Sequence, residues 1–567
     1  MPDADSDNAG PPGHAPADHA AGLTRRDFLK RAGASGVAVA TAPLAGVGHA
    51  FVEGSDGTPE QVHLTWGEDP ATEVIVSWAA AAAAVAPRVR YGETPALEKT
   101  AAAIERTYVD GLNGEKVFTY HARLARLRPG ATVHYAVTAD NDANKDRPFS
   151  AEFSTAPLGR AAFRFTSFGD LATPNTHWLL SSPQSRFGVD AVERFQPLFH
   201  LVNGDLCYAN LNHAAQPAVW REFGNNNQRS AAKRPWMPCL GNHEVELANG
   251  PQGYTSYLTR YTLPDNKTAF PGRWYSFRIG AVLFIALDAD DVIYQDCGPM
   301  LNGPEPFVPA AGTGRAAIEP GRPLYVTGYS GGAQTRWLEA TLRATARDER
   351  IDWIIAQMHQ DALSSTKNGN GSDKGIREHW LPLFDQYGVD LVLCGHDHDY
   401  ERSFPVRGCH HGTGRDAASG KRVDTLQPKP VVTQDPPDAT FDTRQGTIHL
   451  VLGGGGTNVP LNVYGVDPAT GRPQAKVFTK RNAPVPGPKP GTFVRPPADA
   501  VEEAIWSAKR DTESAYGIAV FDVDPGKPGG KTTITMSYYH AVGAGLAASG
   551  DYQLFERIML AKPRRDR

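Results

Sequence analysis

Five segments of this sequence share one layout, in which an apolar run ends at a break and side chains able to bind a metal ion follow. Most of the breaks contain a glycine, and the side chains after them are carboxylates, imidazoles, an amide and a phenol. One Gly-Asp pair or one histidine beside an apolar strand is usually structural, whereas five such segments in order indicate a shared metal site. In chain order these side chains belong to Asp170, Asp205 with Tyr208, Asn242 with His243, His359, and His396 with His398.

The apolar runs have the length and composition of strands that are buried in a layered sheet. Residues 163–168 lead to Gly169 and the first aspartate, and residues 389–393 lead to Gly395 and the last histidine pair. Ligands just past the ends of neighbouring strands gather at one edge of an open α/β sheet. A glycine before a ligand lets the backbone turn sharply and approach an ion closely. We therefore expect the side chains to converge on one pocket.

These motifs resemble those of the purple acid phosphatase branch of the metallophosphoesterases, over residues 169–402 and including the β-rich region before them. Tyr208 separates this branch from relatives that lack a tyrosine ligand. The resemblance implies a binuclear centre of Fe(III) and a divalent ion, which is Zn, Fe or Mn. It implies that Asp170, Tyr208 and His398 bind the ferric ion, that Asn242, His359 and His396 bind the divalent ion, and that Asp205 bridges the two.

The ligand types agree with this assignment on chemical grounds. Two carboxylates and a phenolate suit a hard trivalent ion, while imidazoles and an amide oxygen suit a divalent ion. Three negative ligand charges against five positive charges leave the centre positive, so it attracts a phosphate ester. The resemblance implies hydrolysis of phosphate monoesters, with a metal-bound hydroxide as nucleophile and His243 as general acid. Alternatively, His243 only orients Asn242.

Two other functions stay open from the sequence. The same site could cleave phosphodiesters, because two-metal centres act on both kinds of ester. The chain could instead be a non-catalytic, metal-stabilised surface-binding protein, although structural sites rarely need an open two-metal centre. The expected partners are small phosphate esters. A formal net charge of −5 gives no sign of a nucleic-acid surface, so no nucleic acid is required, and the oligomeric state is not indicated.

The chain departs from the family pattern in two places. The first motif usually reads Asp-x-Gly, but here Ala172 replaces the glycine. Plant-type members also have a histidine pair shortly after the motif of His359, and residues 360–369 contain no histidine. Substrate contacts must therefore come from other residues. The candidates are Asn242, His243, His213, Asn210, Gln360 and Lys367.

After the first 50 residues, the elements that position these side chains form two domains. Short strands separated by turns predict a fibronectin type III-like β-sandwich at residues 51–157. From residue 158 to 567, apolar runs alternate with helical stretches such as residues 335–347, which predicts an α/β catalytic domain. The resemblance implies a four-layer sandwich of two mixed β-sheets flanked by helices. We expect long loop insertions at residues 409–445 and 465–500, and a polar loop near the site at residues 224–228 (GNNNQ).

The first 50 residues resemble a twin-arginine signal peptide. Residues 24–30 (TRRDFLK) precede a mildly apolar segment that is too short to span a bilayer, which needs about 20 apolar residues. We expect export by the twin-arginine pathway to a secreted or cell-wall-associated location, without stable membrane insertion. With five cysteines in the chain, Cys297 and Cys409 could form a disulfide.

Overall fold

The computed structural model describes residues 56–295, 326–367, 370–407, 430–457, 464–479, 499–544 and 548–566, with two short strands, β24 (Val485–Pro486) and β25 (Phe493–Val494). The expected signal peptide and the pair Cys297 and Cys409 lie outside these residues. Cys207, Cys239 and Cys394 are free and buried. Within the described part of the chain, no helix combines the length and the apolar character needed to cross a membrane.

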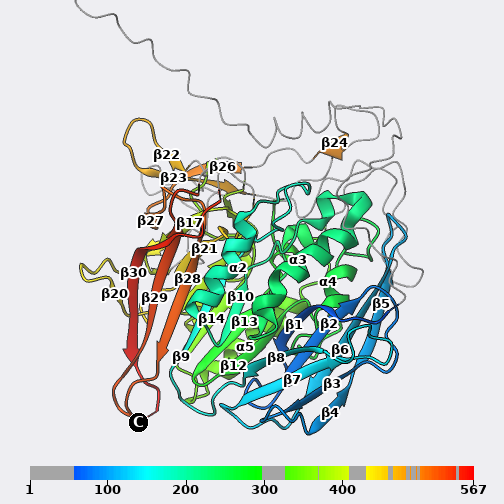
Figure 1. Cartoon of the computed structure of the whole chain (residues 1–567). Helices are drawn as coiled ribbons and strands as arrows, with labels where there is room; N and C mark the ends of the chain where they lie inside the picture. The colour runs from blue at the N-terminus through cyan, green and yellow to red at the C-terminus, as the bar shows by residue number, and fades with distance from the viewer. Residues whose placement is uncertain are drawn as a thin grey trace, which may run out of the picture. The chain divides into compact units, whose positions relative to one another are not determined.

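The β-rich region is a sandwich of two four-stranded antiparallel sheets, drawn in blue and cyan in Figure 1. Aromatic and β-branched side chains fill the space between the sheets, and Trp66 and Trp78 are almost fully buried. One sheet has the order β1 (Glu60–Trp66), β2 (Val74–Ala80), β6 (Lys116–Leu124), β5 (Ile104–Val109). The other has the order β4 (Lys99–Ala102), β3 (Arg88–Gly92), β7 (Thr132–Thr138), β8 (Phe149–Ser154).

Two mixed seven-stranded sheets form the centre of the catalytic region. The first has the order β11 (Trp236–Pro238), β10 (Phe199–Val202), β9 (Phe163–Phe168), β28 (Gly517–Asp524), β29 (Lys531–Ala541), β30 (Tyr552–Pro563), β20 (Thr440–Phe441). The second has the order β12 (Tyr275–Ile279), β13 (Val282–Ala286), β14 (Trp353–Gln357), β16 (Leu391–Cys394), β21 (Ile448–Leu452), β17 (Tyr400–Ser403), β27 (Ser507–Arg510). Each sheet joins parallel and antiparallel neighbours.

Aromatic side chains fill the space between the two sheets. Phe165 of β9 stacks on Phe521 of β28 with ring centroids 4.5 Å apart, and it meets Phe284 of β13 edge-on at 5.2 Å. Such pairs add about 0.5–1.5 kcal/mol each beyond the area they bury. The pair of Phe165 with Phe284 joins the two sheets, whereas the pair of Phe165 with Phe521 lies within the first sheet.

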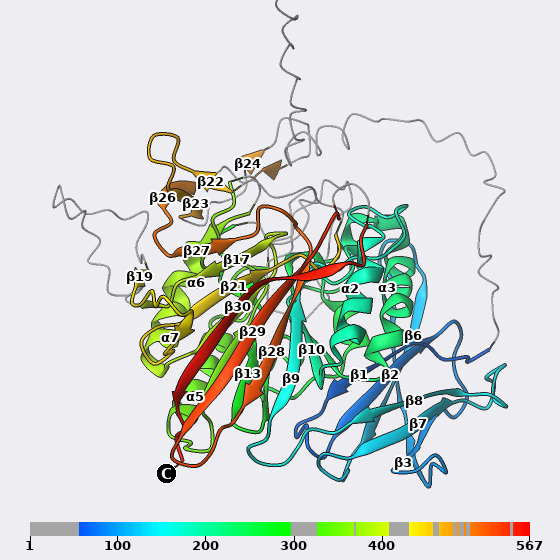
Figure 2. The ribbon, with the colours of Figure 1, turned by 60° about the vertical axis from the view of Figure 1, so that its left-hand side comes forward.

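Helices cover the outer faces of the sheets, which completes the expected four-layer α/β architecture (Figures 1 and 2). Helix α5 (Ala333–Ala346) occupies the predicted helical stretch. The residues expected to form a long surface loop at 465–500 instead contribute strands to a small sheet of β15 (Ser372–Asp373), β22 (Gly465–Val466), β23 (Pro473–Phe478) and β26 (Asp499–Glu503). The helices are α2 (Gln184–Phe195), α3 (Gln216–Ala231), α4 (Thr255–Arg260), α5 (Ala333–Ala346), α6 (Lys374–His379) and α7 (Leu381–Tyr387).

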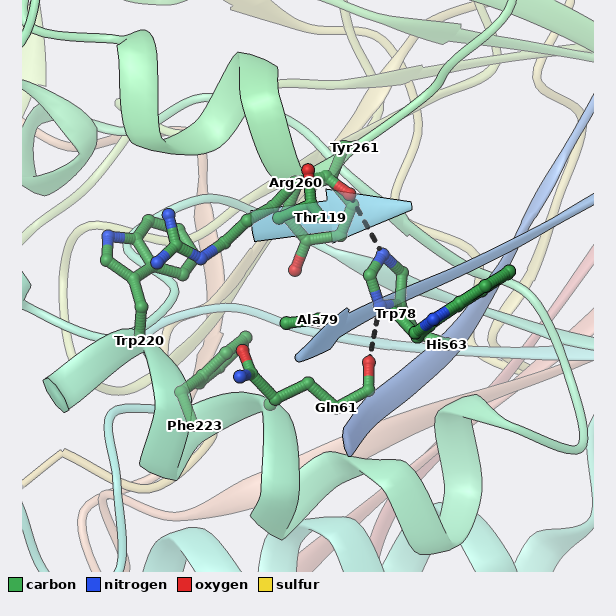
Figure 3. A pocket seen from close by; sticks show the side chains of 10 residues that line it. Gln61, His63, Trp78, Ala79, Thr119, Trp220, Phe223, Arg260 and Tyr261 are labelled. Atoms are coloured by element: carbon green, nitrogen blue, oxygen red, sulfur yellow. Dashed lines mark hydrogen bonds between the residues drawn. The ribbon is translucent and has the colours of Figure 1, made fainter. Parts of the chain in front are cut away.

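Helix α3 joins the β-sandwich to the catalytic region. Asn225 and Gln228 accept hydrogen bonds from the backbone N–H groups of Gln61 (3.1 Å) and Val62 (2.7 Å) in β1. The prediction of a polar loop at residues 224–228 is therefore wrong, because these polar side chains lie on a helix and satisfy the edge of the neighbouring sheet. The same contact surface contains a small pocket, where His63 bridges the carbonyl oxygens of Gln61 and Arg260 (Figure 3). No predicted ligand lines that pocket.

Candidate metal centre

The strands that carry the predicted ligands end at the same level. Phe168 of β9 pairs with Val202 of β10, which pairs with Pro238 of β11, and Gln357 of β14 pairs with Leu393 of β16. All of these pairs are parallel, so within each sheet the chain leaves these strands in the same direction. The predicted ligands therefore emerge together at the carboxyl ends of the two sheets, as the spacing of the motifs predicts.

One group of side chains surrounds the imidazole of His359. Its Nε2 lies 3.0 Å from Asp205 Oδ2, 3.2 Å from Asn242 Oδ1 and 3.2 Å from His396 Nδ1. The possible ligand atoms of Asp205, His359 and His396 all lie within 4.8 Å of one another, and all three residues are buried. This spacing matches donor atoms that share one metal ion.

A second group is built on Asp170. Its Oδ1 accepts a hydrogen bond from the hydroxyl of Tyr208 (2.9 Å) and lies 3.1 Å from His398 Nε2. The Tyr208 hydroxyl oxygen is 3.1 Å from the same His398 nitrogen. The two groups are directly connected, because the backbone N–H of His396 donates to Asp170 Oδ2 at 2.9 Å. The structure thus brings all seven predicted ligands together, with Asp205 in the first group.

The donor atoms around His359 fit a cation. Its Nδ1–H donates to the carbonyl oxygen of Asn203 at 2.7 Å, so the Nε2 of a neutral ring presents a lone pair. That lone pair faces a carboxylate oxygen, an amide oxygen and another ring nitrogen, all of which are electron-rich. Burial alone would lower the pKa of His359, but the carboxylates of Asp205 and Asp170 outweigh it and raise the pKa to about 10. The two carboxylates therefore favour positive charge beside Nε2 of His359, which a divalent ion would supply.

Tyr208 shows the same need for positive charge. Burial and the adjacent Asp170 carboxylate raise the pKa of its phenol well above the usual value. The residue can become a phenolate ligand only when a strongly charged cation offsets those two effects. Carboxylate and phenolate oxygens are hard ligands, and the group of Asp170, Tyr208 and His398 therefore fits a hard cation.

The backbone at the ligands is held in an unusual conformation. Asp170, Asp205, Tyr208 and His396 have φ angles of 60°, 48°, 61° and 67°, in the left-handed region. This region costs L-residues about 1–2 kcal/mol each, and such strain concentrates at functional sites. Ala172, which replaces the glycine of the family motif, also has a φ of 60°. Glycine is usual at this position because it adopts this angle without strain.

Glycines let the backbone pass close to the ligands. A Cβ on Gly204 would lie 2.6 Å from the His359 ring, and a Cβ on Gly395 would lie 2.5 Å from Asp170 Oδ2. In the glycine run at residues 453–456, Gly455 and Gly456 donate backbone hydrogen bonds to the carbonyl oxygens of Gly169 and Asp170 at 2.9 and 3.1 Å. The run is therefore a close passage of backbone beside the site.

His243 lies at the rim of the ligand groups. Its backbone N–H donates to Asp205 Oδ1 at 2.7 Å, and its ring Nδ1–H donates to Asn210 Oδ1 at 2.9 Å. The other ring nitrogen, Nε2, lies 3.9 Å from Asp205 Oδ2, and the side chain is 15% exposed. This nitrogen can reach both the ligand groups and solvent.

The remaining substrate candidates lie in different places. His213 is exposed in the 3₁₀ helix η2 (His213–Ala215), and Lys367 is also exposed. Gln360 is buried and donates to Asp290. Asn210 contacts His243 and is buried, so its place is behind that ring.

The motifs did not reveal two residues that hold the ligand loops. Glu244 is buried and accepts hydrogen bonds from the backbone N–H groups of Asp205 (2.9 Å), Leu206 (2.8 Å) and Gly241 (2.8 Å). Asn203 orients His359 and donates to the carbonyl oxygen of Cys394 at 3.1 Å. Both residues adjoin predicted ligands, and a polar residue that follows an apolar run was the signal that could have identified them.

The chain is similar to known phosphatases and phosphoesterases. Residues 59–156 match the model of the purple acid phosphatase N-terminal domain, and residues 176–400 match that of the calcineurin-like phosphoesterases. An uncharacterized protein of Mycobacterium tuberculosis is 40% identical over 96% of this chain and 97% of its own length. The phosphoenolpyruvate phosphatase of Allium cepa is 27% identical over 62% of this chain and 64% of its own length. The purple acid phosphatase PPD1 from yellow lupin seeds shares the fold, with a TM-score of 0.60 and 18% identity, over 90% of this chain and 75% of that one.

Proposed function

The chain belongs to the purple acid phosphatase branch of the metallophosphoesterases, and we propose that it hydrolyses small phosphate monoesters with His243 as the general acid. The family is one of phosphatases with a dimetal site. The observation that carries the proposal is the pair of connected ligand groups, joined by the hydrogen bond from His396 to Asp170, with His243 Nε2 at their rim.

The ligand groups suggest how two cations would be shared. Asp170, Tyr208 and His398 would hold the ferric ion, while Asn242, His359 and His396 would hold a divalent ion. Asp205, which contacts His359 and the backbone of His243, would bridge them. When bound, two such ions would polarise the phosphate ester and lower the pKa of bound water, which supplies the nucleophile of hydrolysis.

The protein's own groups then handle the leaving group. The hydrogen bond from Nδ1–H of His243 to Asn210 fixes the ring, so Nε2–H points away from Asn210. In this orientation His243 can donate a proton to the departing alkoxide, a contribution typically worth 10²–10⁴-fold in rate. The backbone N–H of His243 also donates to Asp205. This bond fixes the distance between the His243 ring and the metal-binding carboxylate.

The test compares p-nitrophenyl phosphate with bis(p-nitrophenyl) phosphate on metal-loaded protein. Preferred turnover of the monoester supports the proposal, and preferred turnover of the diester would replace it with the phosphodiesterase function. If neither substrate turns over, a non-catalytic binding role takes its place. Changing Asp205→Asn should abolish whichever activity is present.

The identity of the metals is tested separately. Elemental analysis should find iron and one divalent metal per chain, and a phenolate–Fe(III) absorption band should disappear in Tyr208→Phe. A colourless protein that contains only Zn or Mn would remove iron from the proposal and leave the hydrolase in place.

We also propose export by the twin-arginine pathway, which the sequence at residues 24–30 supports. Changing Arg25 and Arg26 to lysine should retain the protein in the cytoplasm of a host that has this pathway. Export that is unaffected by the change would contradict this proposal without bearing on the enzymatic one.

A further inference from the structure

Gln295 is a buried residue outside every sequence motif, and its carboxamide lies against the imidazole of His396. The Gln295 Oε1 atom is 3.0 Å from His396 Nε2, and the residue is 4% exposed. The other ring nitrogen, Nδ1, faces His359 Nε2 at 3.2 Å. We propose that Gln295 is a positioning residue that fixes the tautomer and orientation of His396 for the divalent ion. This inference rests on the ligand set proposed above.

The contact with Gln295 decides which ring nitrogen of His396 carries the proton. A neutral imidazole carries one N–H, and an amide oxygen can only accept a hydrogen bond. The contact with Gln295 Oε1 therefore places the proton of His396 on Nε2. The lone pair is left on Nδ1, the atom that faces His359 and the other ligand atoms of the first group.

The backbone of His396 is held independently of its ring. Its N–H donates to Asp170 Oδ2 at 2.9 Å, and its carbonyl oxygen accepts from Asn370 Nδ2 at 2.7 Å. These bonds fix where the side chain starts, but rotation about the Cβ–Cγ bond could still turn Nδ1 away from His359. The contact with Gln295 restrains that rotation.

The position of Gln295 is itself set by a buried carboxylate. Asp373 accepts hydrogen bonds from the backbone N–H groups of Tyr294 and Gln295, both at 2.9 Å, and from Gly375 at 2.7 Å. The last bond caps the start of helix α6. The segment that carries Gln295 is thus fastened to α6, which follows the His359 motif in the chain.

Removing the residue that accepts the ring N–H of a metal-binding histidine commonly changes metal affinity by 10–100-fold. The same order of effect is expected here, because removing the Gln295 acceptor removes the contact that favours the proton on Nε2 of His396. The effect should fall on one of the two metal sites, since His398 and Tyr208 belong to the other group.

The experiment measures Zn²⁺ binding to metal-stripped full-length protein by competition with a chromophoric chelator. Gln295→Met keeps the size of the side chain without the acceptor, and Gln295→Glu keeps an acceptor. We expect Gln295→Met to raise the dissociation constant of one zinc site by 10–100-fold. The dissociation constants of Gln295→Glu should stay within about threefold of the wild-type values. Gln184→Met is the matched control, because the buried Gln184 contacts Ser549 and Tyr552 instead.

A fourth variant separates this inference from the proposed function. His396→Ala should lose one zinc ion per chain, and an unchanged zinc content would remove His396 from the ligand set. Loss of zinc in His396→Ala together with wild-type affinity in Gln295→Met would overturn the inference about Gln295 alone. If Gln295→Met does not fold, as judged by circular dichroism, Gln295→Ala is used, because it cannot introduce a clash.

Discussion

The backbone N–H of His396 donates a 2.9 Å hydrogen bond to Asp170 Oδ2, across 226 positions of sequence. Asp170 follows the first sheet, and His396 follows the second. This single bond ties the ligand loops of the two sheets together, so a change in either loop should be felt by both groups of ligands.

Changing Gly395→Ala should disturb both metal sites. The added Cβ would lie 2.5 Å from Asp170 Oδ2 and 3.0 Å from His359 Nδ1, so one of these side chains must move. We expect loss of most bound metal and of activity, measured by elemental analysis and p-nitrophenyl phosphate turnover. Gly388→Ala is the control, since its Cβ would meet nothing within 4 Å; it should destabilise the fold by about 1–2 kcal/mol through its φ of 71° and keep its metals. Equal metal loss in both variants would contradict the prediction.

Changing Ala172→Gly should stabilise the protein. The left-handed φ of 60° at this position costs an alanine about 1 kcal/mol, and glycine adopts this conformation without that cost. We expect the free energy of unfolding in urea to rise by up to about 1 kcal/mol, with unchanged metal content. A fall in stability would show that the methyl group packs favourably enough to outweigh the strain.

Removing the contact behind His243 should slow the release of poor leaving groups. We expect Asn210→Leu to lower kcat about 10–100-fold on an alkyl phosphate, as a part of the general-acid contribution. The effect on p-nitrophenyl phosphate should be much smaller, because its leaving group departs without a proton. Equal losses on both substrates would indicate damage to the metal centre instead.

The exposed His213 provides the control for that experiment. Its side chain is exposed in η2, and it was a sequence candidate for substrate binding. We expect His213→Ala to change KM and kcat by less than about twofold, in line with the small effects of most surface substitutions. A large rise in KM would restore it as a substrate contact.

Removing the metals should lower the melting temperature. Four ligands have left-handed backbone, and buried carboxylates lie close together at the site, so the folded state loses a compensating charge when the ions leave. Binding to the native state alone stabilises it by about 2.7 kcal/mol when the free ion is at 100 times its dissociation constant. Calorimetry with and without a chelator measures this shift. An unchanged melting temperature after complete removal would argue against the proposed ligand set.

The sequence predicted the residues that converge but missed those that hold them in place. Asp170, Asp205 and His359 follow buried parallel strands, and the common direction of such strands determines where their ends meet. Gln295 could not be found in this way, because it reaches His396 only through the local path of the chain after β13 and its contact with Asp373. Asn225 was misassigned for a related reason, since its polar character reflects a partner strand more than 160 residues away.

The amides of Asn225 and Gln228 also have a consequence for how much of the chain can work alone. They occupy the N–H groups at the outer edge of β1, an edge that would otherwise be open to pairing with another chain. Each part therefore covers a surface of the other. Without α3, the sandwich would have an unpaired strand edge. Without the sandwich, α3 would expose amides and apolar side chains that normally contact β1. A shortened enzyme that keeps only the metal-binding half should be prone to aggregate.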